Sequence, residues 1–204
     1  MKKYVAVMAF VAVMVVSSVA SAATFKPDDE GFIRNWLLLE PITLDEKAGS
    51  HDEDNQKDFI EKEQYAGLKA SAPKDGEKVK VGDKEMAFKA FQADDSIITF
   101  PEGDNTMNIA VTYIVAEADM ADVKLKIGSD DSSVWYLNGK EIIKVYAGRG
   151  TEKDQDTSST VSLAKGANVL ICKVINGGGP TGMCARFVDK ADAAVKNVTI
   201  ALSK

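Results

Sequence analysis

Histidine and cysteine are scarce in this chain of 204 residues, which has one histidine, His51, and two cysteines. One imidazole cannot build a multi-histidine zinc site, and any Ser-His-Asp or Cys-His mechanism would have to use His51 itself. His51 lies in the charged segment HDEDNQKD, which is typical of a solvated loop, and no G-x-S-x-G motif is present. No pattern singles out the two opposed carboxylates of a glycosidase. We therefore expect a protein that is not an enzyme.

Basic residues are also fewer than acidic ones, with 25 Lys and Arg against 31 Asp and Glu and a net charge of -6. Nucleic-acid affinity comes largely from clustered basic side chains, so a nucleic-acid partner is not expected. Aromatic residues make up only 7 % of the chain, too few for a long stacking platform on crystalline polysaccharide. The hydrophobic content of 45 % at this length indicates a single acidic domain.

The first 22 residues have the pattern of a secretory signal. Lys2 and Lys3 precede an apolar run over 5–16, and Ala20-Ser21-Ala22 fits a signal-peptidase site. A membrane-spanning helix is the alternative, but the run is shorter than the ~20 apolar residues that a bilayer requires. We expect residues 1–22 to be a signal peptide and 23–204 to form one domain, secreted, periplasmic or on the cell surface, with no membrane span once the signal is removed.

If the chain is exported, its two cysteines could form a disulfide. Cys172 and Cys184 lie in NVLICKVI and MCARFV, two strand-like runs on either side of the turn-rich NGGGPTG. A hairpin would place them opposite each other, and a disulfide is compatible with an oxidising compartment. Two separately buried thiols are the alternative, because cysteine is a common small core residue.

Short apolar runs separated by turn signals predict an all-β sandwich. A buried strand is expected within 31–42, then an acidic loop, then one short helix in DFIEKEQYAGL, where Phe59, Ile60, Tyr65 and Leu68 share a face. Val123, Leu125 and Ile127 alternate with lysines, as in a strand with one solvated face. The remaining strands are expected around 79–91 and at 96–100, 108–117, 133–146, 159–163, 167–175, 183–188 and 197–202.

Two segments of the second half, KIGSDDSSVWYLNGKEII and SSTVSLAKGANVLICKVINGGGPTGMCARFVD, resemble the galactose-binding-like jelly-roll domains of exported glycan-degrading systems. The resemblance covers about residues 32–190, and a more distant one is to the anthrax protective-antigen N-terminal-like sugar-binding domain. Asn138-Gly139 is explained without a ligand, because a type I′ hairpin turn needs positive φ at both central positions. The resemblance implies a non-catalytic module that contacts glycan through loops at one end of the sandwich.

The Ser129-Asp130-Asp131-Ser132 loop is the candidate metal site. In the protective-antigen-like domains the matching aspartates hold calcium, so the resemblance implies a calcium site at Asp130 and Asp131, with Asp156, and with Asp154 as a further candidate oxygen donor. In the alternative interpretation the aspartates cap nearby backbone amides in their own turn.

Neighbouring residues on a strand point to opposite faces, so only one of Trp135 and Tyr136 can face the core between two sheets. The family pattern favours Trp135 in the core, which leaves Tyr136 facing water, a ligand or a covering loop; Trp36 lies in a buried run. Arg149 lies between glycines that would let a loop present its guanidinium. The expected glycan contacts are Asp130, Asp131, Tyr136, Arg149 and Asp154. A structural or protein-interaction sandwich of the cell envelope or matrix is the alternative function, with a protein partner in place of a glycan.

Overall fold

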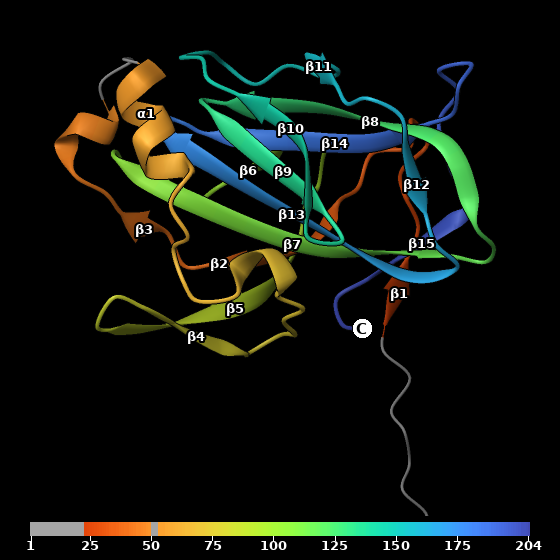
Figure 1. Ribbon diagram of the computed structural model, residues 1–204, viewed down its shortest axis with the longest axis horizontal. Helices are drawn as coiled ribbons and strands as arrows, with labels where there is room; N and C mark the ends of the chain where they lie inside the picture. The colour runs from red at the N-terminus through yellow and green to blue at the C-terminus, as the bar shows by residue number, and fades with distance from the viewer. Residues whose placement is uncertain (1–22, 50–52) are drawn as a thin grey trace, which may run out of the picture.

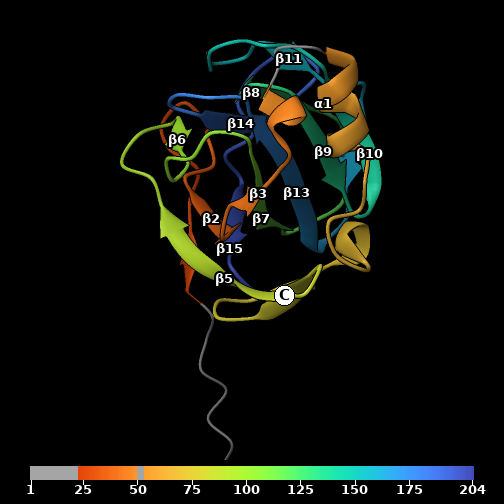
Figure 2. The ribbon, with the colours of Figure 1, turned by 90° about the vertical axis from the view of Figure 1, so that its left-hand side faces the viewer.

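The computed structural model describes residues 23–49 and 53–204, so the predicted signal peptide and His51 lie outside the described residues. The described chain forms two antiparallel sheets that pack face to face, with one short α-helix (Figures 1 and 2). This confirms the predicted all-β sandwich. No helix in the described ranges is both long enough and apolar enough to cross a bilayer.

The larger sheet has ten strands, and its central strand β7 pairs with β13 over eleven residues, from Gly166↔Ala116 to Asn176↔Thr106. Its main path runs β10 (Lys140–Val145), β9 (Ser133–Leu137), β13 (Gly166–Asn176), β7 (Thr106–Ala116), β2 (Asn35–Leu39), β5 (Lys84–Gln92) and β4 (Lys78–Val81). Beside this path, β15 (Val198–Ala201) and β3 (Ile42–Thr43) pair with β7, and β1 (Thr24–Phe25) pairs with β15.

The smaller sheet has five strands around β8, whose alternating Val123, Leu125 and Ile127 face the sandwich interior as the sequence predicts. Its strands are β11 (Asp156–Thr157), β8 (Met120–Asp130), β14 (Gly182–Val188) and β6 (Ile98–Thr99), and β12 (Val161–Leu163) pairs with β8. The Asn138-Gly139 turn between β9 and β10 has positive φ at both residues, as a type I′ turn requires.

The helix lies N-terminal to its predicted position. Helix α1 spans Glu53–Ile60, so it begins within the expected acidic loop and overlaps only the first three residues of the expected helix. The 3-10 turns η1 (Glu46–Gly49) and η2 (Leu68–Ala70) flank it along the chain. Acidic residues in its first turn and Lys57 in its last turn complement the helix dipole. Gln56 and Ile60, four residues apart, are both fully buried. Phe59 is partly buried beside Ile60, so two apolar side chains and one amide anchor a helix that is otherwise polar.

The chain has two hydrophobic cores because both faces of the larger sheet are covered. Between the sheets, Trp36 and Trp135 meet edge to face with ring centroids 6.2 Å apart. On the outer face, Tyr136 packs in a second cluster with Ile60 and Leu68, beneath the segment that contains α1 and η2. Trp135 and Tyr136 are thus both buried, at 0 % and 2 % exposed, and a covering segment occupies the outer side of β9.

The predicted hairpin between the two cysteines is wrong. Cys172 lies on β13 and Cys184 on β14, which belong to different sheets, and both are free thiols. Cys172 points into the interior, where its Sγ lies 2.9 Å from the Sδ of Met183. Cys184 alternates with inward-facing Met183 and Ala185, so it points to the outer face of the smaller sheet, where burial raises its pKa to about 11. Cys172 therefore faces the inside of the sandwich and Cys184 its outside, so the two sulfurs do not meet and the disulfide prediction fails.

Lys173 is buried on the outer face of the larger sheet, only 1 % exposed. Its ammonium donates to the backbone carbonyls of Ile60 and Lys62, the latter at 3.0 Å, and lies 5.7 Å from the ring centroid of Tyr136. These bonds join β13 to the C-terminal end of α1, where carbonyls lack helical partners. Burial lowers the pKa of Lys173 to about 8.

This lowered pKa predicts a pH-dependent stability. The unfolded lysine has its ordinary pKa of 10.5, so between pH 8 and 10.5 the folded state loses the proton first and the penalty for burying the charge is relieved. Relative to Lys173→Met, the wild-type free energy of unfolding is expected to rise over this window by about 1–3 kcal/mol. Urea unfolding of both proteins at pH 7, 8.5, 9.5 and 10 measures the difference between their free energies of unfolding. All other titrating groups are the same in both proteins, so their contributions cancel in this difference. If the difference in free energy of unfolding does not change with pH, the Lys173 ammonium is not buried at a cost in the folded state.

Candidate functional site

The predicted loop residues Asp131, Arg149 and Asp156 do come together, at the end of the sandwich where β8 turns into β9. Asp131 is 4 % exposed, and its two carboxylate oxygens accept backbone N–H bonds from Arg149 at 3.0 Å and Gly177 at 2.9 Å. The Asp130–Asp131 peptide bond is cis. Asp131 therefore does cap backbone amides, but they belong to two loops that are distant in sequence and not to its own turn.

The Arg149 guanidinium binds to neighbouring residues of the loops and is not presented to a glycan. Its Nε donates to the backbone oxygen of Ser129 at 3.1 Å, and its Nη2 lies 3.1 Å from Ser129 Oγ and 2.5 Å from Asp156 Oδ2. Only 20 % of the side chain is exposed. The cationic group is thus used to hold the loop network together.

The other two predicted contacts lie apart from this network. Asp154 forms an ion pair with Arg186 of β14, with Nε and Oδ1 at 2.9 Å. Tyr136 lies on the outer face of the larger sheet under Lys69, so the prediction that it contacts a ligand is wrong because its ring is covered. The expected glycan contacts therefore do not form one surface.

The donor set at this loop does not fit calcium, which takes six to eight oxygen ligands. Both oxygens of Asp131 already accept N–H bonds, and Asp156 is paired with the guanidinium of Arg149. Asp130 supplies its backbone oxygen to the hydroxyl of Thr181. Within the described ranges, no group of three or more His, Cys, Asp or Glu side chains is arranged to hold a metal ion.

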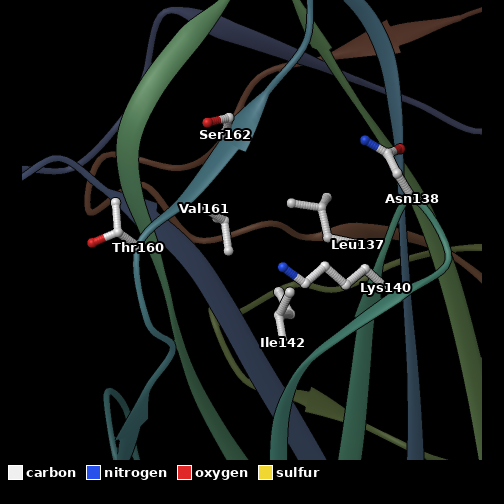
Figure 3. A pocket seen from close by; sticks show the side chains of 7 residues that line it. All are labelled: Leu137, Asn138, Lys140, Ile142, Thr160, Val161 and Ser162. Carbon is white, nitrogen blue, oxygen red and sulfur yellow. The ribbon is translucent and has the colours of Figure 1, made fainter.

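One surface hollow lies between the β9–β10 hairpin and β12, with a volume of about 360 Å³ (Figure 3). Leu137 and Val161 approach each other across it, and the Lys140 side chain extends between them and Ile142. The Asn138 amide is engaged by Asn168 and by the Val169 backbone. No aromatic ring lines this hollow, so it offers no face on which a sugar could stack.

A second hollow, of about 360 Å³, is mostly apolar. Phe91, Leu38 and two prolines line it. Glu40 and Lys89 also line it, and their side chains form an ion pair with the charged atoms 3.2 Å apart. Its polar groups are thus already paired with each other.

A third hollow, of about 350 Å³, is polar, and we call it the Asn35 hollow. It lies where β2 begins and β5 ends, with Asn35 directly opposite Gln92 in the register of the two strands. The segment that follows β1 forms its other wall. Its lining residues are Phe25, Lys26, Pro27, Asp28, Asp29, Arg34, Asn35 and Gln92.

Two charged groups of the Asn35 hollow are held by the fold. The Asp28 carboxylate accepts from the backbone N–H groups of Glu30 and Phe32, at 3.0 and 2.8 Å, and from Ser96 Oγ at 2.8 Å. Arg34 donates from Nε and Nη2 to the backbone oxygen of Ala93, at 2.9 and 2.7 Å. These bonds fix the shape of the hollow before any ligand enters.

Asn35 differs from them, because it is 4 % exposed and its Nδ2 is buried without a hydrogen-bond partner among the described residues. Almost all buried polar groups in proteins are hydrogen-bonded, so an exception at a surface hollow requires an explanation. The sequence contained a signal that we did not use, an amide at the head of the otherwise apolar strand NWLLL.

No family model matches this sequence, and no curated protein sequence is significantly similar to it. The PA14 domain of the MpAFP antifreeze protein is similar in structure, with 11 % identity, a TM-score of 0.46, and coverage of 92 % of this chain and 97 % of that one. A β-glucosidase from Kluyveromyces marxianus in complex with glucose has 18 % identity and a TM-score of 0.41, over 67 % of this chain and 19 % of that one.

An epithelial adhesin A domain from Candida glabrata in complex with β-lactose has 9 % identity and a TM-score of 0.39, over 88 % of this chain and 92 % of that one. Identities and TM-scores this low assign neither a family nor a ligand to this chain.

Proposed function

We propose that this protein is a non-catalytic carbohydrate-binding β-sandwich and that the Asn35 hollow is its glycan site. The signal-like pattern of residues 1–22 supports export of a domain over 23–204. The loop network at Asp131 is a structural element in this proposal, because its polar groups bond to one another.

The observation that carries the proposal is the polar lining of the Asn35 hollow, whose shape the hydrogen bonds of Asp28 and Arg34 hold. The amide of Gln92 and the carboxylate of Asp29 are exposed at the same hollow. Planar polar groups beside a half-buried aromatic ring, here Phe25, are the chemistry that a pyranose requires.

Gln92→Leu is expected to weaken glycan binding at least tenfold, a loss of about 1.4 kcal/mol, without lowering the free energy of unfolding. Leucine removes an exposed amide of the hollow that would bond to the ligand, and substitutions at exposed positions change stability little. A glycan array followed by calorimetry of the best ligand measures the affinity, and urea unfolding measures the stability.

Ser159→Leu is the control, because Ser159 is exposed and lies just before β12, outside the lining of the hollow. If Gln92→Leu binds glycan as the wild type does, Gln92 is not part of the site. If the wild type is retained by no glycan and forms oligomers in light scattering, the carbohydrate proposal fails and the structural or protein-interaction sandwich takes its place.

A further inference from the structure

We propose that the hollow between the β9–β10 hairpin and β12 binds a small aliphatic monocarboxylate. The carboxylate would lie at Lys140, and the aliphatic body would lie on Leu137, Ile142 and Val161. This hollow shares no lining residue with the Asn35 hollow, so binding here does not depend on the proposed glycan site.

The hollow lies at an open side of the sandwich. Strand β10 ends the larger sheet and pairs with β9, whereas β12 pairs with β8 of the smaller sheet, so these two described edge strands do not pair with each other. Ile142 and Val161 are partly buried and pack against the core between the sheets, which includes Leu137. The apolar floor is therefore an exposed continuation of that core, and an aliphatic group placed on it is withdrawn from water.

Lys140 is the one charged side chain of this lining, so far as the structure describes the chain. It is exposed and extends between the apolar side chains of the floor (Figure 3). Lys144 of the same strand is paired with Glu61 and Glu141, whereas Lys140 forms no ion pair with a described residue. An unpaired cation beside an apolar floor is complementary to a ligand with one negative charge next to an aliphatic body.

The size of the hollow and the rest of its lining narrow the class of ligand. Its volume of about 360 Å³ is near the lower end of the range for ligand pockets, about 300–1,000 Å³, so the ligand is small. Thr160 and Ser162 line the same hollow with exposed hydroxyls, which are further donors for a carboxylate oxygen. A dianion such as phosphate would leave one charge without a cation. A monocarboxylate with a short branched chain fits these groups.

An NMR titration of the protein with isovalerate tests the inference, with acetate, isoamyl alcohol and inorganic phosphate as comparison ligands. Acetate keeps the carboxylate without the branched chain, and isoamyl alcohol keeps the branched chain without the charge. We expect isovalerate to bind more tightly than each of the three by a factor of about five or more. The amide resonances that shift are expected to lie on β10 and β12.

Lys140→Gln is expected to weaken isovalerate binding about fivefold and to leave isoamyl alcohol unchanged, because only the acid uses the ammonium. Lys84→Gln is the matched control, since Lys84 is an exposed lysine at the start of β5, outside this lining. Val161→Ala removes part of the floor and is expected to weaken both the acid and the alcohol. The amide spectrum of each variant shows whether it is folded.

Each contrary outcome removes a defined part of the assignment. Equal binding of isoamyl alcohol and isovalerate, or unchanged isovalerate binding in Lys140→Gln, would overturn the role of Lys140. Equal binding of acetate would overturn the role of the apolar floor, and equal binding of phosphate would overturn the choice of a monocarboxylate. Shifts confined to other strands, or no binding of isovalerate, would overturn the site itself. All of these outcomes leave the glycan proposal at the Asn35 hollow as it stands.

Discussion

Trp135→Ala is expected to lower the free energy of unfolding by about 3–5 kcal/mol, which is a large fraction of the stability of a typical domain. Trp135 is fully buried between the two sheets and meets Trp36 edge to face at 6.2 Å. Its Nε1 also donates to Ser133 Oγ at 3.0 Å, a bond that the alanine variant loses. The cost arises because the surrounding strands cannot collapse into the space that the indole leaves.

Urea unfolding followed by circular dichroism measures this loss. Trp135→Phe is the companion variant, because it keeps an aromatic ring in the core and lacks only the indole nitrogen and part of the volume; a clearly smaller loss is expected. If both variants unfold at the same urea concentration as the wild type, Trp135 is not packed in the core.

Asp131→Asn is expected to lower the free energy of unfolding by about 2–3 kcal/mol, whether or not calcium is present. The amide nitrogen would face a backbone N–H of Arg149 or Gly177, so one of the two loops loses its acceptor. Calcium and a chelator should leave the melting temperature of the wild type unchanged, because only a ligand that binds the folded state raises it.

Glu117→Gln, at an exposed position, removes the same charge and is the control. Thermal melts of all three proteins with added calcium and with chelator give the result. A calcium-dependent rise in the wild-type melting temperature that disappears in Asp131→Asn would contradict the capping role and restore a metal site at this loop.

Local sequence patterns predicted the strands and turns well, because each depends on neighbouring residues. The alternation of Val123, Leu125 and Ile127 predicted which side of β8 is buried, and Asn138-Gly139 predicted a hairpin turn. The first buried strand within 31–42 is present as β2. Both patterns follow from backbone geometry, where alternate residues of a strand share a face and a tight turn requires positive φ.

Strand partners followed less reliably from the sequence. The segment NGGGPTG has the composition of a hairpin turn, yet it leads from β13 in one sheet to β14 in the other. A glycine-rich connection permits both paths, and β13 instead gains eleven residue pairs with β7, far away in sequence. The disulfide prediction failed for this reason, since it depended on which strands pair and not on the cysteines.

The amino-acid pattern alone predicts an acidic, strand-rich chain with one histidine and the local turns of a β-sandwich. What covers the outer face of the larger sheet, where Tyr136 and Lys173 are buried, and which polar groups satisfy one another depend on contacts between distant segments. The alternation of apolar and polar residues shows which face of a strand a residue occupies, but the segments that pack against that face are distant in sequence. For the same reason the paired carboxylate of Asp131 and the unpartnered amide of Asn35 become distinguishable only in the folded chain.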